Sequence, residues 1–244
     1  MIMRTLVVHL GGIGDFLLTC PALAHLTREG PLELLGHAER LQLAVAAGVA
    51  EAAHDLDTVD FSSAFTQPTP RLEAFLSRFD RALLWMRAAA TVQRAFQQAG
   101  IHGVRAFPGL PPSDWTRHAS EYYLACLNAP PAPPFQLHLP PLEPPLDIVI
   151  HPGSGGQKKN WPIDQFSAVA GALTRAGRFV TWLRGPAEQE LPYPAHAPII
   201  SFTSLHELGC ALSNAALYIG NDSGITHLAA AVACPVLAIF GPTD

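Results

Sequence analysis

Residues 5–16 read Thr5-Leu-Val-Val-His-Leu-Gly-Gly-Ile-Gly-Asp-Phe16, and they give the clearest indication of the fold class. The apolar run Leu6–Leu10 predicts a buried strand, and Gly11–Asp15 follow it as a turn. The apolar spacing of Phe16–Thr27 then predicts a helix. A buried strand that passes through a glycine turn into a helix is typical of α/β proteins with a parallel sheet.

The same alternation of strand and helix continues to residue 127 and starts again at residue 147. In the first half we expect strands at Leu32–Leu35, Ala82–Met86 and His102–Phe107, and helices at His37–Ala47, Arg71–Phe79, Ala89–Ala99 and Ser113–Leu127, the last capped by Ser113. In the second half we expect strands at Asp147–His151, Phe179–Arg184, Ile199–Phe202, Ala216–Ile219 and Val236–Phe240, and helices at Pro162–Ala176, Ser204–Ser213 and Ser223–Ala233. Near-continuous apolar strands in such a pattern predict parallel sheets covered on both faces.

The two halves are separated by Asn128–Leu146, in which 8 of 19 residues are proline. This density is incompatible with a helix or a central strand and predicts a semi-rigid connector. We therefore expect two Rossmann-like domains, 1–128 and 147–244, joined by a linker over 129–146, with a ligand-binding cleft between them. Beyond Phe240 we find no helix to cover the last strand, so we expect the second domain to be truncated.

Composition argues against several classes of protein. The chain of 244 residues is 49% hydrophobic and 14% charged, with a net charge of −5, which excludes a disordered chain and gives no reason to expect a nucleic-acid partner. The four cysteines form no CxxC or Cys/His cluster, so we expect neither a disulfide scaffold nor a zinc site. We find no signal-peptide pattern, and no apolar run reaches the ~18 residues of a membrane span. We expect a soluble cytoplasmic protein.

Three strand–turn–helix junctions carry candidate chemistry, and the first contains Gly12, Gly14 and Asp15. Its glycines can direct backbone N–H groups at an anion near a helix start. The glycine spacing does not match the dinucleotide-binding fingerprint. Asp15 is either an ordinary acid in the first turn of a helix or a general base at the carboxyl end of the sheet.

The second junction, His151-Pro-Gly-Ser-Gly-Gly-Gln-Lys-Lys-Asn-Trp-Pro162, holds both lysines of the chain, Lys158 and Lys159. Its glycines let backbone N–H groups approach an oxyanion, the Ser154 hydroxyl can donate a hydrogen bond, and a lysine supplies positive charge for phosphate. The spacing is not that of a Walker loop. A flexible surface loop with solvated lysines remains the alternative.

The third junction is Gly220-Asn-Asp-Ser-Gly-Ile-Thr-His227. Asp222 or Ser223 is expected to cap the following helix, and the free N–H groups at that helix start can also face a diphosphate. His227 lies about one turn beyond Ser223 and can share its side of the helix.

Three other short sequence patterns give little support for a function. Asp55-Leu-Asp57 has the form of a metal-binding DxD, but so short a pattern often arises by chance, and we expect no metal there. His206-Glu207 is not part of HExxH, because Cys210 occupies the second histidine position. No GxSxG pattern supports a hydrolase.

Together, the stretch Leu10–Asp15, the Lys-Lys-Asn-Trp-Pro loop and the stretch from Gly220 to His227, closing on Phe240-Gly-Pro-Thr-Asp244, resemble the heptosyltransferase family of lipopolysaccharide glycosyltransferases, glycosyltransferase family 9. The resemblance implies a GT-B-like fold and an inverting, metal-independent transfer of heptose from ADP-heptose to a lipopolysaccharide inner-core acceptor. It implies no cofactor beyond the nucleotide-sugar donor. A lipid-linked acceptor also leaves peripheral contact with the inner face of the inner membrane open.

The resemblance also implies a role for each candidate residue. It makes Asp15 the catalytic base, with Gly12 and Gly14 in an acceptor or phosphate loop; Ser154 and Lys159 phosphate ligands; Glu188 the acid that holds the nucleoside ribose; and Asp222, Ser223, Gly224 and His227 the turn that binds sugar and diphosphate. Two alternatives stay open: a related transferase with another nucleotide sugar or acceptor, and a nucleotide-binding fragment without catalysis.

Overall fold

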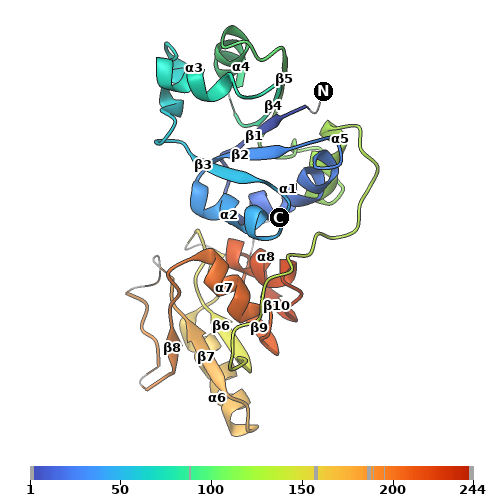
Figure 1. Cartoon of the computed structure of the whole chain (residues 1–244). Coiled ribbons are helices and arrows are strands. Elements are labelled where there is room, and N and C mark those ends of the chain that lie inside the picture. Colours follow the sequence, from blue (N-terminus) through green and yellow to red (C-terminus); the bar gives the residue numbers. More distant parts are fainter. Residues whose placement is uncertain are drawn as a thin grey trace. The chain divides into compact units, whose positions relative to one another are not determined.

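The computed structural model describes residues 3–87, 89–156, 159–185, 188, 190–194 and 196–241. The chain divides into two compact units, Met1–Phe135 and Gln136–Asp244 (Figure 1). Each unit contains one five-stranded sheet whose strand pairs are all parallel. The expected α/β fold with two Rossmann-like parts is confirmed.

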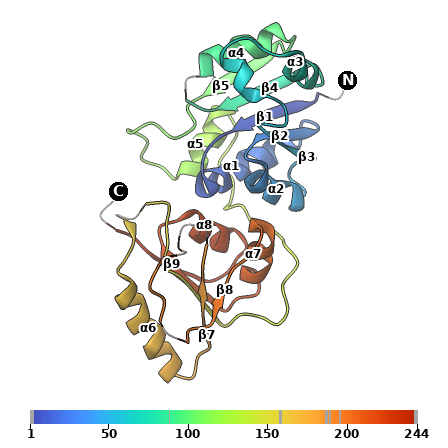
Figure 2. The same cartoon turned by 90° about the vertical axis from the view of Figure 1, so that its left-hand side faces the viewer.

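The first unit has the strand order β3-β2-β1-β4-β5. Its elements are β1 (Thr5–His9), α1 (Ile13–Leu26), β2 (Leu32–Gly36), α2 (Ala38–Ala46), β3 (Ala52–Asp55), the 3-10 helix η1 (Phe61–Phe65), α3 (Pro70–Leu76), β4 (Arg81–Trp85), α4 (Ala89–Gln98), β5 (Gly103–Phe107) and α5 (Ala119–Cys126). One face of the sheet is covered by η1, α3 and α4, and the other by α1, α2 and α5 (Figures 1 and 2). Burial on both faces explains why the strands read as apolar runs.

The second unit has the order β10-β9-β6-β7-β8. Its elements are β6 (Ile148–His151), α6 (Ile163–Arg175), β7 (Val180–Leu183), β8 (Ile199–Ile200), α7 (Leu205–Leu212), β9 (Leu217–Asn221), α8 (Gly224–Ala231) and β10 (Val236–Ile239). Helix α6 packs through Phe166 against Ile150 and Trp182 on one face, and α7 and α8 lie on the other (Figures 1 and 2).

Both units have the same doubly wound arrangement. The first strand, β1 or β6, lies inside the sheet, and the chain adds strands on one side of it before it crosses to the other. In open parallel sheets, ligands bind at the carboxyl ends of the strands where the order reverses. This rule directs attention to the ends of β1 and β4 in the first unit and of β6 and β9 in the second.

The structure differs from the expected elements at several places. Helix α1 begins at Ile13 and not at Phe16, so part of the expected turn Gly11–Asp15 is helical, and η1 is not predicted by the sequence. Two further differences have a clear physical reason. The edge strand β3 is not predicted by the sequence, because its residues are only half-buried and its four positions include His54 and Asp55, which gives a weak apolar signal. The expected helix start at Ser113 is wrong, since the helix begins at Ala119 and is capped by His118, whose Nδ1 accepts the Ser120 N–H. Most side chains of residues 112–118 are exposed, so no apolar face supports a helix there.

The boundary between the units falls inside the proline-rich segment. After Phe135, Leu137 and Leu139 are buried. The backbone N–H of Leu137 donates to the carbonyl of Ala231 at 2.7 Å, and that of Leu142 donates to the carbonyl of Cys210 at 3.0 Å. The second half of the segment is therefore part of the second unit.

Candidate functional site

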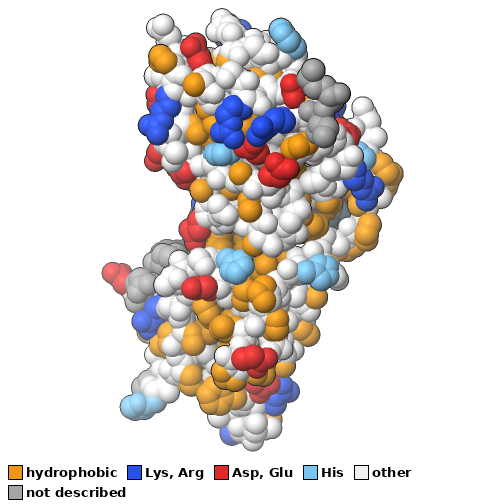
Figure 3. All heavy atoms as spheres, in the orientation of Figure 1, with side chains coloured by type: hydrophobic (Ala, Val, Ile, Leu, Met, Phe, Trp, Pro, Cys, Tyr) orange, Lys and Arg blue, Asp and Glu red, His pale blue; other side chains and the backbone are white. Residues whose placement is uncertain are grey.

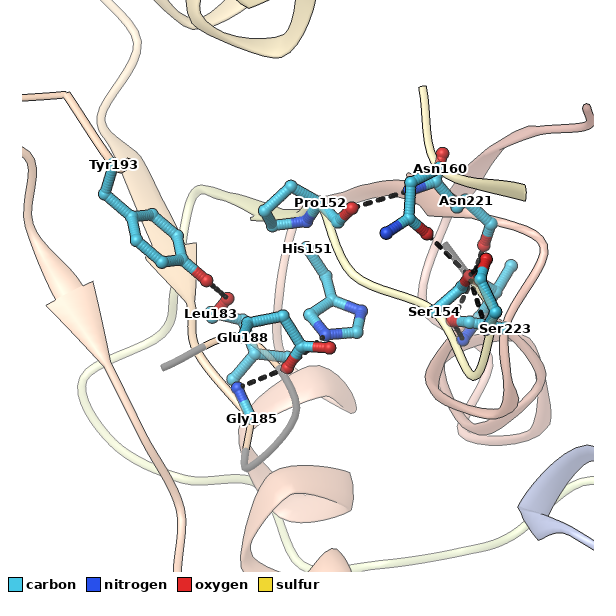
Figure 4. Close-up of polar contacts among 12 residues, drawn as sticks. His151, Pro152, Ser154, Asn160, Leu183, Gly185, Glu188, Tyr193, Asn221 and Ser223 are labelled. Carbon is cyan, nitrogen blue, oxygen red and sulfur yellow. Dashed lines mark hydrogen bonds and ion pairs between the residues drawn. The ribbon is translucent and has the colours of Figure 1, made fainter. Parts of the chain in front are cut away.

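Glycine-rich loops meet at the carboxyl ends of β6 and β9, where the strand order of the second unit reverses (Figure 4). His151 ends β6 and Asn221 ends β9. Residues 152–162 lead from β6 to α6, and Asp222 and Ser223 connect β9 to α8. The second and third junctions of the sequence therefore lie side by side.

One side chain links these two loops. Asn221 is fully buried, and its Nδ2 donates to the carbonyl of Pro152 at 2.7 Å. Its Oδ1 accepts the backbone N–H of Trp161 at 2.9 Å. The Asn221 amide thus donates a hydrogen bond to one end of the loop that follows β6 and accepts a hydrogen bond from the other end.

An ion pair joins the same two loops. Nζ of Lys159 lies 2.8 Å from Oδ2 of Asp222, and both side chains are partly exposed. A lysine ammonium has three donors, so this pair leaves capacity for a further acceptor. Lys158, the other candidate, lies outside the described residues.

The Ser154 hydroxyl takes part in the internal structure of its loop. Its Oγ lies 2.6 Å from Oδ1 of Asn160 and 2.9 Å from the carbonyl of Gly156, and it accepts the Gly156 N–H at 3.3 Å. A hydroxyl has a single hydrogen to donate, so the two carbonyl oxygens compete for it. Donation to a phosphate stays a prediction that requires one of these contacts to open.

Ser223 is the N-cap of α8, and its Oγ accepts the N–H of Thr226 at 3.3 Å. Gly224 is the first helical residue, and His227 lies in the first turn, partly exposed. The capping role expected for Asp222 or Ser223 therefore belongs to Ser223, and Asp222 is left to pair with Lys159.

A buried polar network lies beneath these loops. Oε2 of Glu188 accepts the Gly185 N–H at 2.9 Å and lies 3.5 Å from Nε2 of His151. Nδ1 of His151 lies 3.3 Å from the Tyr218 hydroxyl, which in turn lies 3.3 Å from Oγ1 of Thr226. The contact with His151 holds the pKa of Glu188 below its usual value in spite of burial. Burial raises the pKa of Tyr218 to about 12, so Tyr218 stays a neutral phenol.

Gly153 fits closely against this network. A Cβ atom at Gly153 would lie 2.0 Å from Oε1 of Glu188, so either the loop or the Glu188 side chain would have to shift. The glycine is needed so that the loop can pass the buried carboxylate. Gly155 differs, because no atom lies within 4 Å of the position of its Cβ.

Asp15 lies in the first unit, in the first turn of α1. Its Oδ2 accepts the N–H of Gly12 at 3.0 Å, so the anion held by this glycine turn is the carboxylate of the chain itself. The interpretation as an N-terminal helix acid describes this contact, and a base role for Asp15 stays a prediction. The ring of His9 lies beside Gly11, with its Cε1 2.8 Å from where a Gly11 Cβ would be, and burial lowers the pKa of His9 to about 4.

Comparison with known proteins bears most strongly on the second unit. Residues 138–244 match the family model of glycosyltransferase family 9 (heptosyltransferase). The matched stretch lies in the second unit and is less than half of the chain. It includes the expected donor-site residues, Ser154, Lys159, Glu188, Asp222, Ser223, Gly224 and His227.

A curated relative is similar to part of the chain. Lipopolysaccharide heptosyltransferase 3 of Escherichia coli K12 is 36% identical over 107 residues, a match that covers 40% of this chain and 31% of the relative. The chain thus matches about a third of the length of this curated relative.

Solved structures show that both units share the fold of this family. A family 9 glycosyltransferase from Veillonella parvula superposes with a TM-score of 0.80 at 17% identity, over 100% of this chain and 83% of the other. The ADP-heptose lipopolysaccharide heptosyltransferase II of E. coli superposes with a TM-score of 0.80 at 18% identity, over 99% of this chain and 86% of the other. Asp15, Gly12 and Gly14 lie in the first unit, outside the matched family 9 residues, where the likeness is one of fold.

Metal ligands do not gather in the part of the chain that the structure describes, since no group of three His, Cys, Asp or Glu side chains is placed to hold an ion. Asp55 instead accepts the Asp57 N–H at 3.0 Å as a turn residue. A more distant structural neighbour, TibC of E. coli, with a TM-score of 0.63 and 18% identity over 98% of this chain and 58% of the other, is described as iron-containing.

The charges of the first unit do not form a field of one sign. On the face drawn in Figure 3, basic side chains lie beside acidic ones. Arg81 pairs with Glu29 at 2.6 Å and Arg117 with Glu121 at 3.3 Å. Among the described helices none is both long and apolar enough to cross a membrane.

Sequence reasoning missed the residues that hold the candidate site together: Asn221, His151, Tyr218 and Thr226. His151, Asn221 and Thr226 lie within the quoted motifs, but the motifs alone assign them no role. A detectable signal exists for His151 and Asn221, because each is a polar residue at the buried carboxyl end of an apolar strand, where it needs partners.

Proposed function

We propose that this chain is a glycosyltransferase that moves a heptose from ADP-heptose to a lipopolysaccharide inner-core acceptor, with inversion at the anomeric carbon and without a metal ion. The Lys159–Asp222 pair at the reversal point of the second unit carries the proposal, because it combines a cation for a diphosphate with a carboxylate for sugar hydroxyls.

In the proposed donor site, Lys159 neutralises the leaving diphosphate, together with backbone N–H groups at the start of α8. Ser154 donates its hydroxyl to a phosphate oxygen, and Glu188 holds the nucleoside ribose. Asp222 and His227 bind hydroxyl groups of the sugar. Each of these residues lies in or directly after a loop at the carboxyl end of the second sheet.

In the proposed reaction, Asp15 takes the proton of the acceptor hydroxyl as its oxygen attacks the anomeric carbon from the face opposite the diphosphate. The bond from that carbon to the diphosphate oxygen breaks, and ADP leaves with the electron pair. One base and one stabilised leaving group complete an inverting transfer.

The test is transfer by the purified chain from ADP-heptose to a lipid-A-type inner-core acceptor, in parallel with EDTA and with Mg²⁺. We expect one ADP released per heptose transferred, at equal rates in both conditions. A dependence on metal would contradict the metal-free mechanism. If a panel of donors shows turnover of another nucleotide sugar in place of ADP-heptose, that sugar nucleotide is the donor. Nucleotide binding without any turnover would overturn the assignment as an enzyme.

A further inference from the structure

Asn221 is a buried polar side chain that the proposed reaction does not use. It is fully buried at the last position of β9, between Gly220 and Asp222. Its side-chain orientation is fixed by its partners, since the nitrogen faces the carbonyl of Pro152 and the oxygen faces the N–H of Trp161. Figure 4 shows this amide beside the loop that follows β6. Satisfied groups of this kind are costly to disrupt when buried.

The two partners of Asn221 are the two ends of one loop. Pro152 directly follows β6, and Trp161 immediately precedes Pro162 at the start of α6. Between them lie Ser154 and Lys159. A single amide therefore closes the loop that carries both expected phosphate ligands.

The middle of the described part of this loop, at Gly155 and Gly156, is not fixed by packing. Neither Gly155 nor Gly156 has any atom within 4 Å of its Cβ position, so side-chain packing does not hold this part of the loop. Glycine-rich segments lose much conformational entropy when ordered. Hydrogen bonds hold the described part of the loop, among them those of the Asn221 amide at its ends, the Ser154–Asn160 contact, and the bond that the Lys159 N–H donates to the Gly156 carbonyl at 2.9 Å.

Asn221 also helps to fix the strand end that carries Asp222, the carboxylate partner of Lys159. Its carbonyl accepts a hydrogen bond from Oγ1 of Thr226, which anchors the end of β9 to α8. The next residue, Asp222, receives Nζ of Lys159. The same residue thus fixes the loop that carries the lysine and the strand end that carries its carboxylate.

We propose that Asn221 is a positioning residue that holds the 152–161 loop so that Lys159 is placed for a diphosphate before the ligand binds. This inference rests on the proposed nucleotide-sugar site. No other common side chain fits both partners with the same geometry. Aspartate is isosteric but has no donor for the Pro152 carbonyl, and leucine has neither group.

The experiment compares wild type with Asn221→Asp and the control Asn214→Asp, using ADP and adenosine as probes. Asn214 is a partly exposed asparagine of the same unit whose amide donates to Glu143 at 3.3 Å. We expect Asn221→Asp to raise the Kd for ADP by about tenfold or more and to leave adenosine binding, followed by NMR titration, unchanged. The control should match wild type with both probes.

A double-mutant cycle with Lys159→Met separates positioning from general stability. If Asn221 acts through the lysine, the double variant should bind ADP no more weakly than Lys159→Met alone. Independent, additive losses, equal loss of ADP and adenosine, or unchanged ADP binding by Asn221→Asp would each overturn the proposal. If Asn221→Asp does not fold, Asn221→Gln, which keeps donor and acceptor on a longer stem, is measured in the same cycle.

Hydrogen exchange distinguishes failure of this inference from failure of the proposed function. Lack of ADP binding by wild type would contradict the nucleotide-sugar site. The backbone N–H of Trp161 should still be protected in wild type and exchange faster in the Asn221 variant, with Trp182 on β7 unchanged. Equal Trp161 protection in both proteins would show that the amide does not hold the loop.

Discussion

Nζ of Lys159 lies 2.8 Å from Oδ2 of Asp222, so the cation placed at the reversal point of the second sheet is already matched with an anion. The pair has two consequences. A diphosphate must share the Lys159 ammonium with the Asp222 carboxylate. The carboxylate is also held close to the proposed position of the sugar that is attached to the diphosphate.

The Asp222→Asn substitution should therefore act oppositely on two ligands. Loss of the carboxylate removes the competitor for Lys159, so the affinity for ADP should stay the same or rise by a few-fold. ADP-heptose should bind more weakly, because an ionised acceptor for sugar hydroxyls is lost. Calorimetric titration of both ligands measures the ratio. Asp164→Asn, an exposed acid in the first turn of α6, is the control, and a parallel weakening of both ligands by Asp222→Asn would contradict the division of roles.

The Asp15→Asn substitution tests the base. Asparagine retains an oxygen that can accept the Gly12 N–H, so stability should change little. The rate of transfer should fall by about 10²–10⁴, as expected for loss of a general base, while the Kd for ADP stays unchanged. Glu39→Gln, a change of an acid in the first turn of α2, provides the matched control. Wild-type turnover by Asp15→Asn would remove Asp15 from the mechanism.

The Gly153→Ala substitution should disturb the buried carboxylate below the loop. Its Cβ would lie 2.0 Å from Oε1 of Glu188, so either the loop or Glu188 must move, at a cost of about 1–3 kcal/mol in the free energy of unfolding. Gly155→Ala is the matched control in the same loop, with no atom within 4 Å of its Cβ position, and should change stability by less than about 0.5 kcal/mol. Denaturant unfolding measures both, and equal stability of the two variants would contradict the packing described for Glu188.

Acid should destabilise the first unit in a way that depends on His9. Burial lowers the pKa of this histidine from 6.5 to about 4, so the unfolded chain binds more protons between these values. The free energy of unfolding keeps its full contribution from His9 above pH 6.5. As the pH falls towards 4, this group lowers the free energy of unfolding by about 3 kcal/mol in total.

Unfolding free energies of wild type and His9→Leu between pH 7 and pH 4 check this account. The slope should be shallower in His9→Leu, whereas His37→Leu, a change at an exposed histidine, should keep the wild-type slope. Glu33 adds a separate loss at lower pH, because hydrogen bonds from His54 and Arg4 outweigh its burial and hold its pKa below 4.5. Identical slopes for wild type and His9→Leu above pH 4.5 would show that His9 is not the group responsible.

The fold could be predicted largely because buried parallel strands are apolar along their whole length. Strands such as Thr5–His9 and Ile148–His151 stand out for this reason, while β3, a half-buried edge strand, does not. The helix start expected at Ser113 is wrong because a capping residue and a nearby acid say nothing about whether an apolar face follows.

The sequence predicts the separate loops of the candidate site but not the contacts between them. Glycine turns after strands indicated where anions could bind, and the structure brings Lys159 and Asp222 together from positions far apart in the chain. A pairing of this kind depends on strand order, which the pattern of single strands does not contain. The same holds for Asn221, whose partners are set by the parallel pairing of β6 with β9.

Calorimetric titration of the whole chain with ADP, in the presence of EDTA, tests whether the loops after β6 and β9 bind the nucleotide. We predict saturable binding at one site by wild type, weakened about tenfold or more in Lys159→Met and unchanged in Arg175→Met, a control at an exposed arginine of α6. No binding by wild type, or equal binding by Lys159→Met, would contradict the claim that the loops after β6 and β9 form a nucleotide-sugar site.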